Sequence, residues 1–139
     1  MRKVPFSSPD ITEQDIKAVV DAIKSGWLAH GDYSELLEDL FCEYTGARFA
    51  TTVSSCTAGL HLSCLAAGFT KNDEVIIPAQ THVATAHAVE YTGAKPVFVD
   101  VNPINGNIQL ESIKAKLSNR TKGIIPVPRP YRLSRLQQN

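Results

Sequence analysis

The chain has 139 residues, 43% of them hydrophobic and 20% charged, which is the composition of an ordinary soluble globular protein. Fourteen basic residues cancel fourteen acidic ones, so the charge balance argues against nucleic acid as a partner. No apolar run reaches membrane-spanning length and the N-terminus lacks a signal-peptide core, so we expect a cytoplasmic protein without membrane contact. The three cysteines, Cys42, Cys56 and Cys64, favour reduced thiols over a disulfide framework or a metal site.

The first part of the chain predicts two amphipathic helices behind an extended arm that contains two prolines. Thr12, followed three residues later by Asp15, indicates an N-cap with a capping box, and Gly26 marks the end of the first helix. Ser34 is expected to cap the second helix, which Gly46 closes. Each helix carries one apolar stripe, formed by Ile16, Val19, Val20 and Ile23 in the first and by Leu37, Leu40, Phe41 and Tyr44 in the second.

Residues 49–59, FATTVSSCTAG, predict a short β-strand that turns directly into a helix beginning at Thr57. The first backbone N–H groups of a helix have no intrahelical partner, and the positive end of the helix dipole lies behind them. This geometry binds a phosphate or a carboxylate without any charged side chain. The turn is therefore the candidate anion site of the chain.

Beyond this turn, helices and strands alternate along the sequence. The helix from Thr57 to about residue 67 has little polar surface, so we expect it to be buried. Alternation at this spacing indicates an α/β protein with a mainly parallel sheet. The further elements are predicted as strands at 74–78, 96–101 and 122–127, with helices over 83–91 and 110–117 between them.

Several enzyme classes use a strand–turn–helix junction of this kind. The sequence motifs of three of these classes are missing here. A P-loop requires a Lys after its glycines, a dinucleotide-binding turn requires G-x-G-x-x-G, and a hydrolase nucleophile elbow requires G-x-S-x-G. Cys56 is a candidate nucleophile because it stands at a helix N-terminus, but no histidine supported by a carboxylate is identifiable. The alternative from the residues alone is a polar turn that only caps its helix.

A longer stretch of the chain carries a resemblance to a known family. The segment SSCTAGLHLSCLAAG, followed by NDEVIIPAQTHVATAHAVEYTGAKPVFVDV and preceded by SGWLAHG, resembles the N-terminal half of the DegT/StrS family of sugar aminotransferases. The motifs occur in the family's order and spacing from about Val4 to Val127, whereas GDYSELLEDL departs because the family more often has a Pro after that Gly. The resemblance implies that residues 1–127 form part of a fold-type I large domain that uses pyridoxal 5′-phosphate (PLP).

The resemblance also implies roles for single residues. The family's phosphate turn, S-[GAC]-T-[AS], matches Ser55, Cys56, Thr57 and Ala58. The backbone N–H groups of Cys56 and Thr57, with the Thr57 hydroxyl, would then hold the PLP phosphate. His82 stands where the family has an aromatic residue that stacks on the pyridine ring, and the alternative for His82 is a strand-end histidine without a ligand.

The other features that the resemblance touches are less directly tied to the cofactor. Residues 27–31 resemble the loop that approaches the active site near the dimer interface. His61 and His87 fall within predicted helices, and we expect neither to reach the site.

The catalytic groups of PLP chemistry are not identifiable in this chain. Transamination needs a lysine that binds the cofactor covalently and an acidic partner for the pyridinium nitrogen. In the family both lie beyond the point where this chain stops, and none of the eight lysines here has the sequence context of the Schiff-base lysine. Asp100 ends a predicted strand, but the family pattern assigns the ring partner to a later Asp. We therefore name no catalytic residue.

Residues 128–139, PRPYRLSRLQQN, carry three arginines and no packing pattern, and we expect them to form a disordered tail. A basic tail for nucleic acid or acidic lipid is the alternative. The resemblance to the family stops abruptly after about Val127, and we expect a truncation or frameshift there as the best explanation of the tail. In fold-type I proteins later strands separate the first strand from the next three. We therefore expect residues 49–54 to be unpaired and the chain to be marginally stable.

Taken with the resemblance, these residues predict an N-terminal fragment of a PLP-dependent aminotransferase that acts on a nucleotide-linked keto-sugar. We expect glutamate to be the amino donor. The expected role is in amino-sugar and surface-polysaccharide biosynthesis, and the full-length form is expected to be a homodimer. The alternatives are a non-catalytic protein that retains the phosphate site and an inactive gene remnant.

Overall fold

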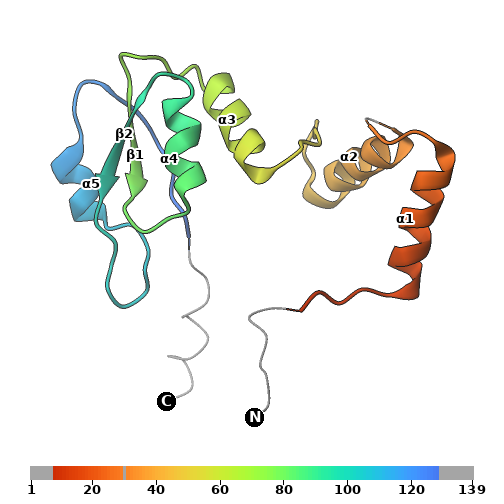
Figure 1. The fold of residues 1–139 in the computed structure, drawn as a ribbon. Helices are drawn as coiled ribbons and strands as arrows, with labels where there is room; N and C mark the ends of the chain where they lie inside the picture. The colour runs from red at the N-terminus through yellow and green to blue at the C-terminus, as the bar shows by residue number, and fades with distance from the viewer. Residues whose placement is uncertain (1–7, 30, 129–139) are drawn as a thin grey trace, which may run out of the picture. The chain divides into compact units, whose positions relative to one another are not determined.

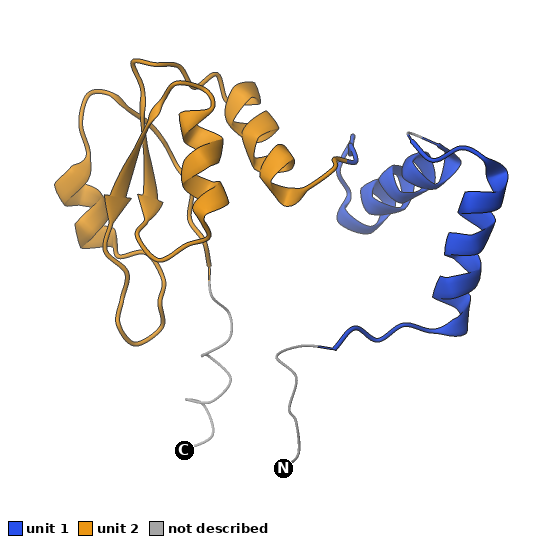
Figure 2. Ribbon diagram, in the orientation of Figure 1, with its two compact units in different colours: residues 1–52 blue, residues 53–139 orange. Residues whose placement is uncertain are grey.

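The computed structural model describes residues 8–29 and 31–128, which belong to two compact units (Figure 1 and Figure 2). Unit 1 comprises residues 1–52 and unit 2 comprises residues 53–139. Most of the predicted N-terminal arm and almost all of the predicted basic tail lie outside the described residues. Every helix in the described part is too short or too polar to cross a membrane.

Unit 1 begins with helix α1 (Glu13–Ser25), whose predicted capping box is confirmed. The Thr12 hydroxyl accepts a hydrogen bond from the Asp15 N–H at 3.3 Å, and the Asp15 carboxylate accepts one from the Thr12 N–H at 2.7 Å. Two donors that the helix cannot satisfy by itself are thus paired. The helix ends at Gly26, which adopts the left-handed conformation with φ 74°.

Helix α2 (Asp32–Thr45) begins two residues before the predicted cap, so the assignment of Ser34 as N-cap is wrong. Gly31 is the N-cap instead, and its carbonyl accepts a hydrogen bond from the Ser34 N–H at 2.8 Å. Asp32 then stands in the first turn, where its negative charge suits the positive end of the helix dipole. The end of the helix at Gly46 is as predicted.

The apolar stripes of α1 and α2 have the predicted spacing but are not buried. Neither helix has a buried residue; Val19 is 60% exposed and Phe41 is 54% exposed. The apolar spacing therefore predicted the two helices correctly, but within the described residues their apolar faces are not covered.

The strand predicted at residues 49–54 is absent, and this segment has no regular secondary structure. Phe49 at its start is 80% exposed. A strand exists only where another strand pairs its N–H and C=O groups, and this segment pairs with none of the described strands. Thr52 is instead held to α2, because its N–H and its hydroxyl both donate to Glu38 Oε1, at 2.6 and 2.8 Å.

Unit 2 contains a parallel sheet of β1 (Glu74–Pro78), β2 (Lys95–Val99) and β3 (Thr121–Ile124), in the order β2-β1-β3. All five residues of the central strand β1 are buried. Ile76 pairs with Val97 on one side and with Ile124 on the other. The prediction that these three strands pair with one another without residues 49–54 is confirmed.

Three helices flank this sheet: α3 (Cys56–Ala66), α4 (Val83–Glu90) and α5 (Leu110–Lys116). The crossover through α4 leads from β1 to β2, and the one through α5 leads back past β1 to β3. Right-handed crossovers in opposite directions place α4 and α5 on opposite faces of the sheet. On the α4 face the core is formed by Cys64, Val75, Ile77, Ala88, Val89 and Ala94. The chain is therefore an α/β protein with a small parallel sheet.

The prediction that α3 is buried is wrong for most of the helix. Cys64 is its one buried residue, while Leu62 and Leu65 are about half exposed. Leu60 and Cys64 pack against the core, so one face of α3 is covered and the other is open. The uniformly apolar sequence did not distinguish a helix covered on one side from a helix covered on all sides.

A carboxylate at the amino end of β1 ties the three strands together. Glu74 is buried, with 6% of its surface exposed. It accepts a hydrogen bond from the Ser118 hydroxyl at 2.7 Å, forms an ion pair with Arg120, and lies 4.0 Å from Lys95 Nζ. The Ser118 hydrogen bond first, and then the positive charges of Arg120 and Lys95, lower the pKa of Glu74 below its ordinary value.

Candidate functional site

The candidate anion site lies at the first turn of α3. Ser55 is the N-cap in an extended conformation, and its hydroxyl accepts a hydrogen bond from the Ala58 N–H at 3.1 Å. The Gly59 N–H donates to the Ser55 carbonyl at 3.1 Å. The N–H groups of Cys56 and Thr57 have no acceptor among the described residues. The two donors that the sequence predicted for a phosphate are thus the two that the cap leaves free.

The electrostatic surroundings of these donors favour an anion. The first turn of α3 contains no acidic side chain, so no carboxylate competes for the free N–H groups. The positive end of the helix dipole adds a favourable potential at this point. The Cys56 side chain is exposed, and the site is therefore open to a ligand from solvent.

His82 is the N-cap of α4, a role that the sequence did not predict. Its Nδ1 accepts a hydrogen bond from the Ala84 N–H at 3.2 Å. Since Nδ1 is the acceptor, the neutral imidazole carries its proton on Nε2. The cap fixes the orientation of the exposed ring, and Nε2–H is left as a donor.

The helices α3 and α4 begin on the same side of the sheet. Figure 1 shows them packed side by side, both starting at the end to which the strand arrows point. The chain passes from the end of β1 at Pro78 through four residues into α4 at Val83. In α/β folds, ligands bind at the carboxyl ends of the strands. The free N–H groups of α3 and the capping ring of His82 therefore face the end of the fold where a ligand is expected.

The lysines of unit 2 lie away from this end of the sheet. Lys95 is the first residue of β2, Lys122 is the second residue of β3, and Lys71 precedes β1, so these three stand at the amino ends of the strands. Lys114 and Lys116 belong to α5 on the opposite face. Within the described part of unit 2, no lysine is placed near the start of α3 and α4.

The remaining histidines of unit 2 lie farther along their helices. The rings of His61 and His87 lie 5.3 and 5.8 Å from the ring of Tyr91, which follows α4. His61 Nε2 is buried and has no hydrogen-bond partner among the described residues. The predicted active-site loop, residues 27–31, belongs to unit 1, and its residue 30 lies outside the described part.

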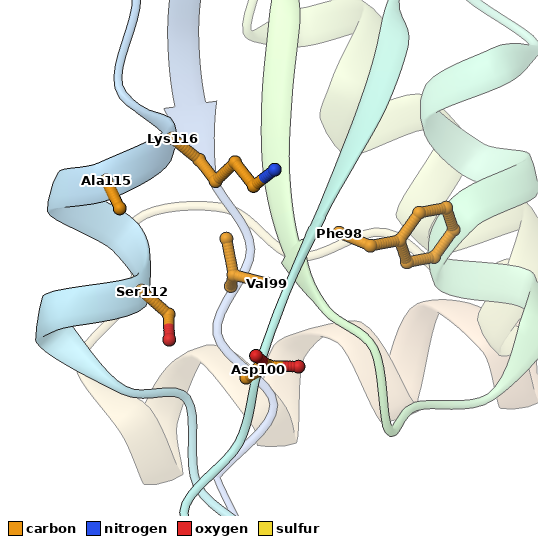
Figure 3. Close-up of a pocket in the computed structure, with 6 residues that line it drawn as sticks. All are labelled: Phe98, Val99, Asp100, Ser112, Ala115 and Lys116. Atoms are coloured by element: carbon orange, nitrogen blue, oxygen red, sulfur yellow. The ribbon is translucent and has the colours of Figure 1, made fainter.

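A cleft of about 300 Å³ lies between β2 and α5, and the sequence did not predict it. Of its lining residues, the sequence analysis singled out only Asp100, as the residue that ends a predicted strand. Ser112 and Lys116 are four residues apart and share one face of α5, which is a signal that the sequence did contain. The cleft is drawn in Figure 3 and is lined by Phe98, Val99, Asp100, Ser112, Ala115 and Lys116.

Comparison with known proteins identifies the family. Residues 9–129 match the DegT/DnrJ/EryC1/StrS aminotransferase family, which is most of the chain. The chain belongs to this family. The family uses PLP, and the structure is that of a partial fold-type I domain.

Individual relatives agree with this assignment. The UDP-4-amino-4-deoxy-L-arabinose–oxoglutarate aminotransferase of Shewanella sediminis is 45% identical over 124 residues, which are 89% of this chain and 32% of that protein. The assigned sugar aminotransferase Spr1654 of Streptococcus pneumoniae, in its PMP-form, is 35% identical with a TM-score of 0.84, over 90% of this chain and 32% of that one. The chain thus spans about a third of the length of the curated relatives it matches.

A third relative catalyses a different named reaction on the same fold. The GDP-4-keto-6-deoxymannose-3-dehydratase with a trapped PLP-glutamate geminal diamine is 28% identical with a TM-score of 0.80. The match covers 89% of this chain and 34% of that one.

Proposed function

We propose that this chain provides the cofactor-phosphate site of a PLP-dependent aminotransferase that acts on nucleotide-linked keto-sugars. The observation that carries the proposal is the pair of free N–H groups on Cys56 and Thr57, held open by the Ser55 cap. A helix N-terminus with two unpaired donors and no acidic neighbour matches the chemistry of a phosphate monoester.

The residues around the first turns of α3 and α4 have distinct roles in this proposal. The N–H groups of Cys56 and Thr57 bind the phosphate, and the Thr57 hydroxyl adds a third donor. The His82 ring, fixed by its bond to the Ala84 N–H, offers one face for the pyridine ring to stack on. When bound, PLP supplies an electron sink for the exchange of an amino group, and the protein supplies its orientation.

The substrate class in the proposal rests on the names of the relatives. The Shewanella enzyme is named for a UDP-linked amino sugar and oxoglutarate, and the dehydratase for a GDP-linked keto-sugar, with glutamate trapped on PLP. We therefore propose a nucleotide-linked keto-sugar and glutamate as the two substrates. The reaction would then belong to amino-sugar and surface-polysaccharide synthesis. A homodimer and a cytoplasmic location remain predictions.

The positions of the lysines support the view that this chain holds the cofactor without reacting with it. The described lysines of unit 2 stand at the amino ends of the strands or on α5. The same observation favours the second candidate, a phosphate-binding protein without catalysis, for the chain by itself. In both cases the anion site at α3 is the functional feature, and none of the described lysines of unit 2 is placed to react with a cofactor there.

Binding of pyridoxine 5′-phosphate to the full chain tests the anion site, because this analogue lacks the aldehyde that would react with surface lysines. Cys56→Pro deletes one free N–H at the first helical position, where proline is well tolerated. The residue before it, Ser55, already has the extended conformation that a following proline requires. The loss of one charge-assisted hydrogen bond should raise Kd about tenfold or more.

Cys56→Ala is the matched control, since it removes the thiol and keeps the N–H, and its Kd should stay within about twofold of the wild-type value. Circular dichroism establishes that α3 is retained in both variants. Equal Kd values for the proline and alanine variants would show that the α3 N–H groups do not hold the phosphate, and the proposal would then be abandoned.

A further inference from the structure

The cleft between β2 and α5 contains two charged side chains of opposite sign that do not pair with each other. Neither the Lys116 ammonium nor the Asp100 carboxylate forms an ion pair or a side-chain hydrogen bond with any residue of the described chain. Figure 3 shows Lys116 Nζ at one end of the cleft and the Asp100 carboxylate at the other. Opposite charges that remain separated around a hollow can each serve a charge on one ligand.

The floor and wall between these two charges are small and apolar. Val99 is buried, with 3% of its surface exposed, and Figure 3 shows its side chain pointing into the cleft between the charged groups. Ala115 lines the wall on α5. The hollow of about 300 Å³ is at the small end of the range for small-molecule sites. A ligand that fits it is compact, carries one charge of each sign, and has only a small apolar group to lie against Val99 and Ala115.

Ser112 supplies the third polar group of the cleft. Its hydroxyl donates to Gln109 Oε1 at 3.3 Å, so its oxygen lone pairs are available to accept from a ligand. In Figure 3 this oxygen lies toward the Asp100 end of the cleft. One end thus presents two acceptors, Asp100 and Ser112, and the other end presents one cation.

We propose that the β2–α5 cleft binds a small neutral α-amino acid, with the ligand carboxylate on Lys116 and its ammonium on Asp100 and Ser112. One fixed positive charge and one fixed negative charge match a zwitterion of net charge zero. An acidic amino acid such as glutamate would bring a second carboxylate for which the cleft has no cation. The site lies on the opposite face of the sheet from α3 and α4, so it is separate from the proposed cofactor site.

The test is a titration of the ¹⁵N-labelled 139-residue chain with L-alanine, followed by NMR. Saturable shifts are expected at the amides of Val99, Asp100 and Ala115 and not at Cys56, with a Kd on the order of 1 mM for a site with two open charge contacts. N-acetyl-L-alanine, which lacks the ammonium, and L-alaninamide, which lacks the carboxylate, should each bind at least tenfold more weakly.

Variants assign the two ends of the ligand. Lys116→Met and Asp100→Asn should each raise the Kd for L-alanine about tenfold, and Lys114→Met, in the same last turn of α5 but not lining the cleft, should leave it unchanged. Absence of saturable shifts with L-alanine, equal binding of N-acetyl-L-alanine, or an unchanged Kd in Lys116→Met would each overturn the proposal. None of these outcomes bears on pyridoxine 5′-phosphate binding at α3, so the two sites fail independently.

Discussion

At the scale of single residues, the first turn of α3 shows how one side chain decides which backbone groups are available. Ser55 uses its hydroxyl to satisfy the Ala58 N–H, and the N–H groups of Cys56 and Thr57 stay free. A side chain at the cap that satisfied an earlier N–H would have reduced the anion site. The proposed phosphate site therefore depends on Ser55 as much as on Cys56 and Thr57, whose N–H groups it leaves free.

The alkylation rates of the three cysteines test the accessibility of this turn in solution. Cys56 is exposed at the proposed phosphate site, whereas Cys64 is 3% exposed and burial raises the pKa of its thiol. Because the thiolate is the reactive form, iodoacetamide at pH 8 should alkylate Cys56 at least about tenfold faster than Cys64. Peptide mass spectrometry over time measures both rates in one sample.

Pyridoxine 5′-phosphate should slow the alkylation of Cys56 and leave Cys42, which is in unit 1, unaffected. Cys42 is thus the internal control. Protection of all three thiols would indicate a general effect of the ligand, and protection of none would contradict a phosphate at the first turn of α3.

Much of this site was predictable from sequence, and the part that was not has a physical explanation. The turn, its free donors and the start of the helix within one residue followed from capping chemistry that acts over three or four residues. The role of His82 as a cap was missed because its Nδ1 reaches only two residues ahead and histidine is an uncommon N-cap. The β2–α5 cleft was missed because its lining residues come from two elements, and the sequence does not show that these elements lie side by side.

At the scale of elements, sequence reasoning located the helices and strands but could not tell what covers them. The glycine ends of α1 and α2 and the extents of β1 and α4 follow from local signals. Residues 49–54 have a strand-like sequence and no strand neighbour in the sheet β2-β1-β3, so they form none. Burial and pairing are properties of partners, which a local pattern does not contain.

The difference between exposed and buried apolar faces leads to a paired prediction. Val89 in α4 is 0% exposed within the unit 2 core, and Val89→Ala should lower the free energy of unfolding by about 2 kcal/mol. Val19 in α1 is 60% exposed, and Val19→Ala should change it by less than about 0.5 kcal/mol. Urea titrations of both variants measure the two values under the same conditions.

Val19→Ala serves as the matched control, because it removes the same two methyl groups from a helix. A large destabilisation by Val19→Ala would show that the α1 stripe is covered in solution. A small effect of Val89→Ala would contradict the packing of α4 on β1.

At the scale of the whole molecule, three strands form a small sheet in which β2 and β3 are both edges. Exposed strand edges and apolar helix faces add little to stability, so marginal stability of the isolated chain stays a prediction. In a sheet this small, the cluster around Glu74 should supply a larger share of the stability than one ion pair does in a large protein. It links the first residue of β1 to Lys95 of β2 and to Ser118 and Arg120, which lie just before β3.

The stability of the chain should therefore depend on pH through Glu74. Its hydrogen bond from Ser118 and the charges of Arg120 and Lys95 lower its pKa in the folded state below the unfolded value of 4.5. A group of this kind stabilises the fold above its unfolded pKa, and the contribution is lost as pH falls through the lower folded pKa. The urea midpoint should be flat near neutral pH and should fall below about pH 4.5.

Glu74→Gln isolates this contribution, because the amide keeps an acceptor for Ser118 and cannot titrate. Its midpoint should be lower than that of the wild type at pH 7, and the two should converge as pH falls through the lowered folded-state pKa and the wild-type carboxylate is protonated. Asp15 and Asp73, whose pKa values are lowered by hydrogen bonds from Thr12 and Thr70, leave a residual slope in both proteins. Glu90→Gln, at an exposed position at the end of α4, is the control and should follow the wild-type curve. Parallel curves for wild type and Glu74→Gln over the whole range would mean that the cluster at the amino ends of the strands does not hold the sheet together.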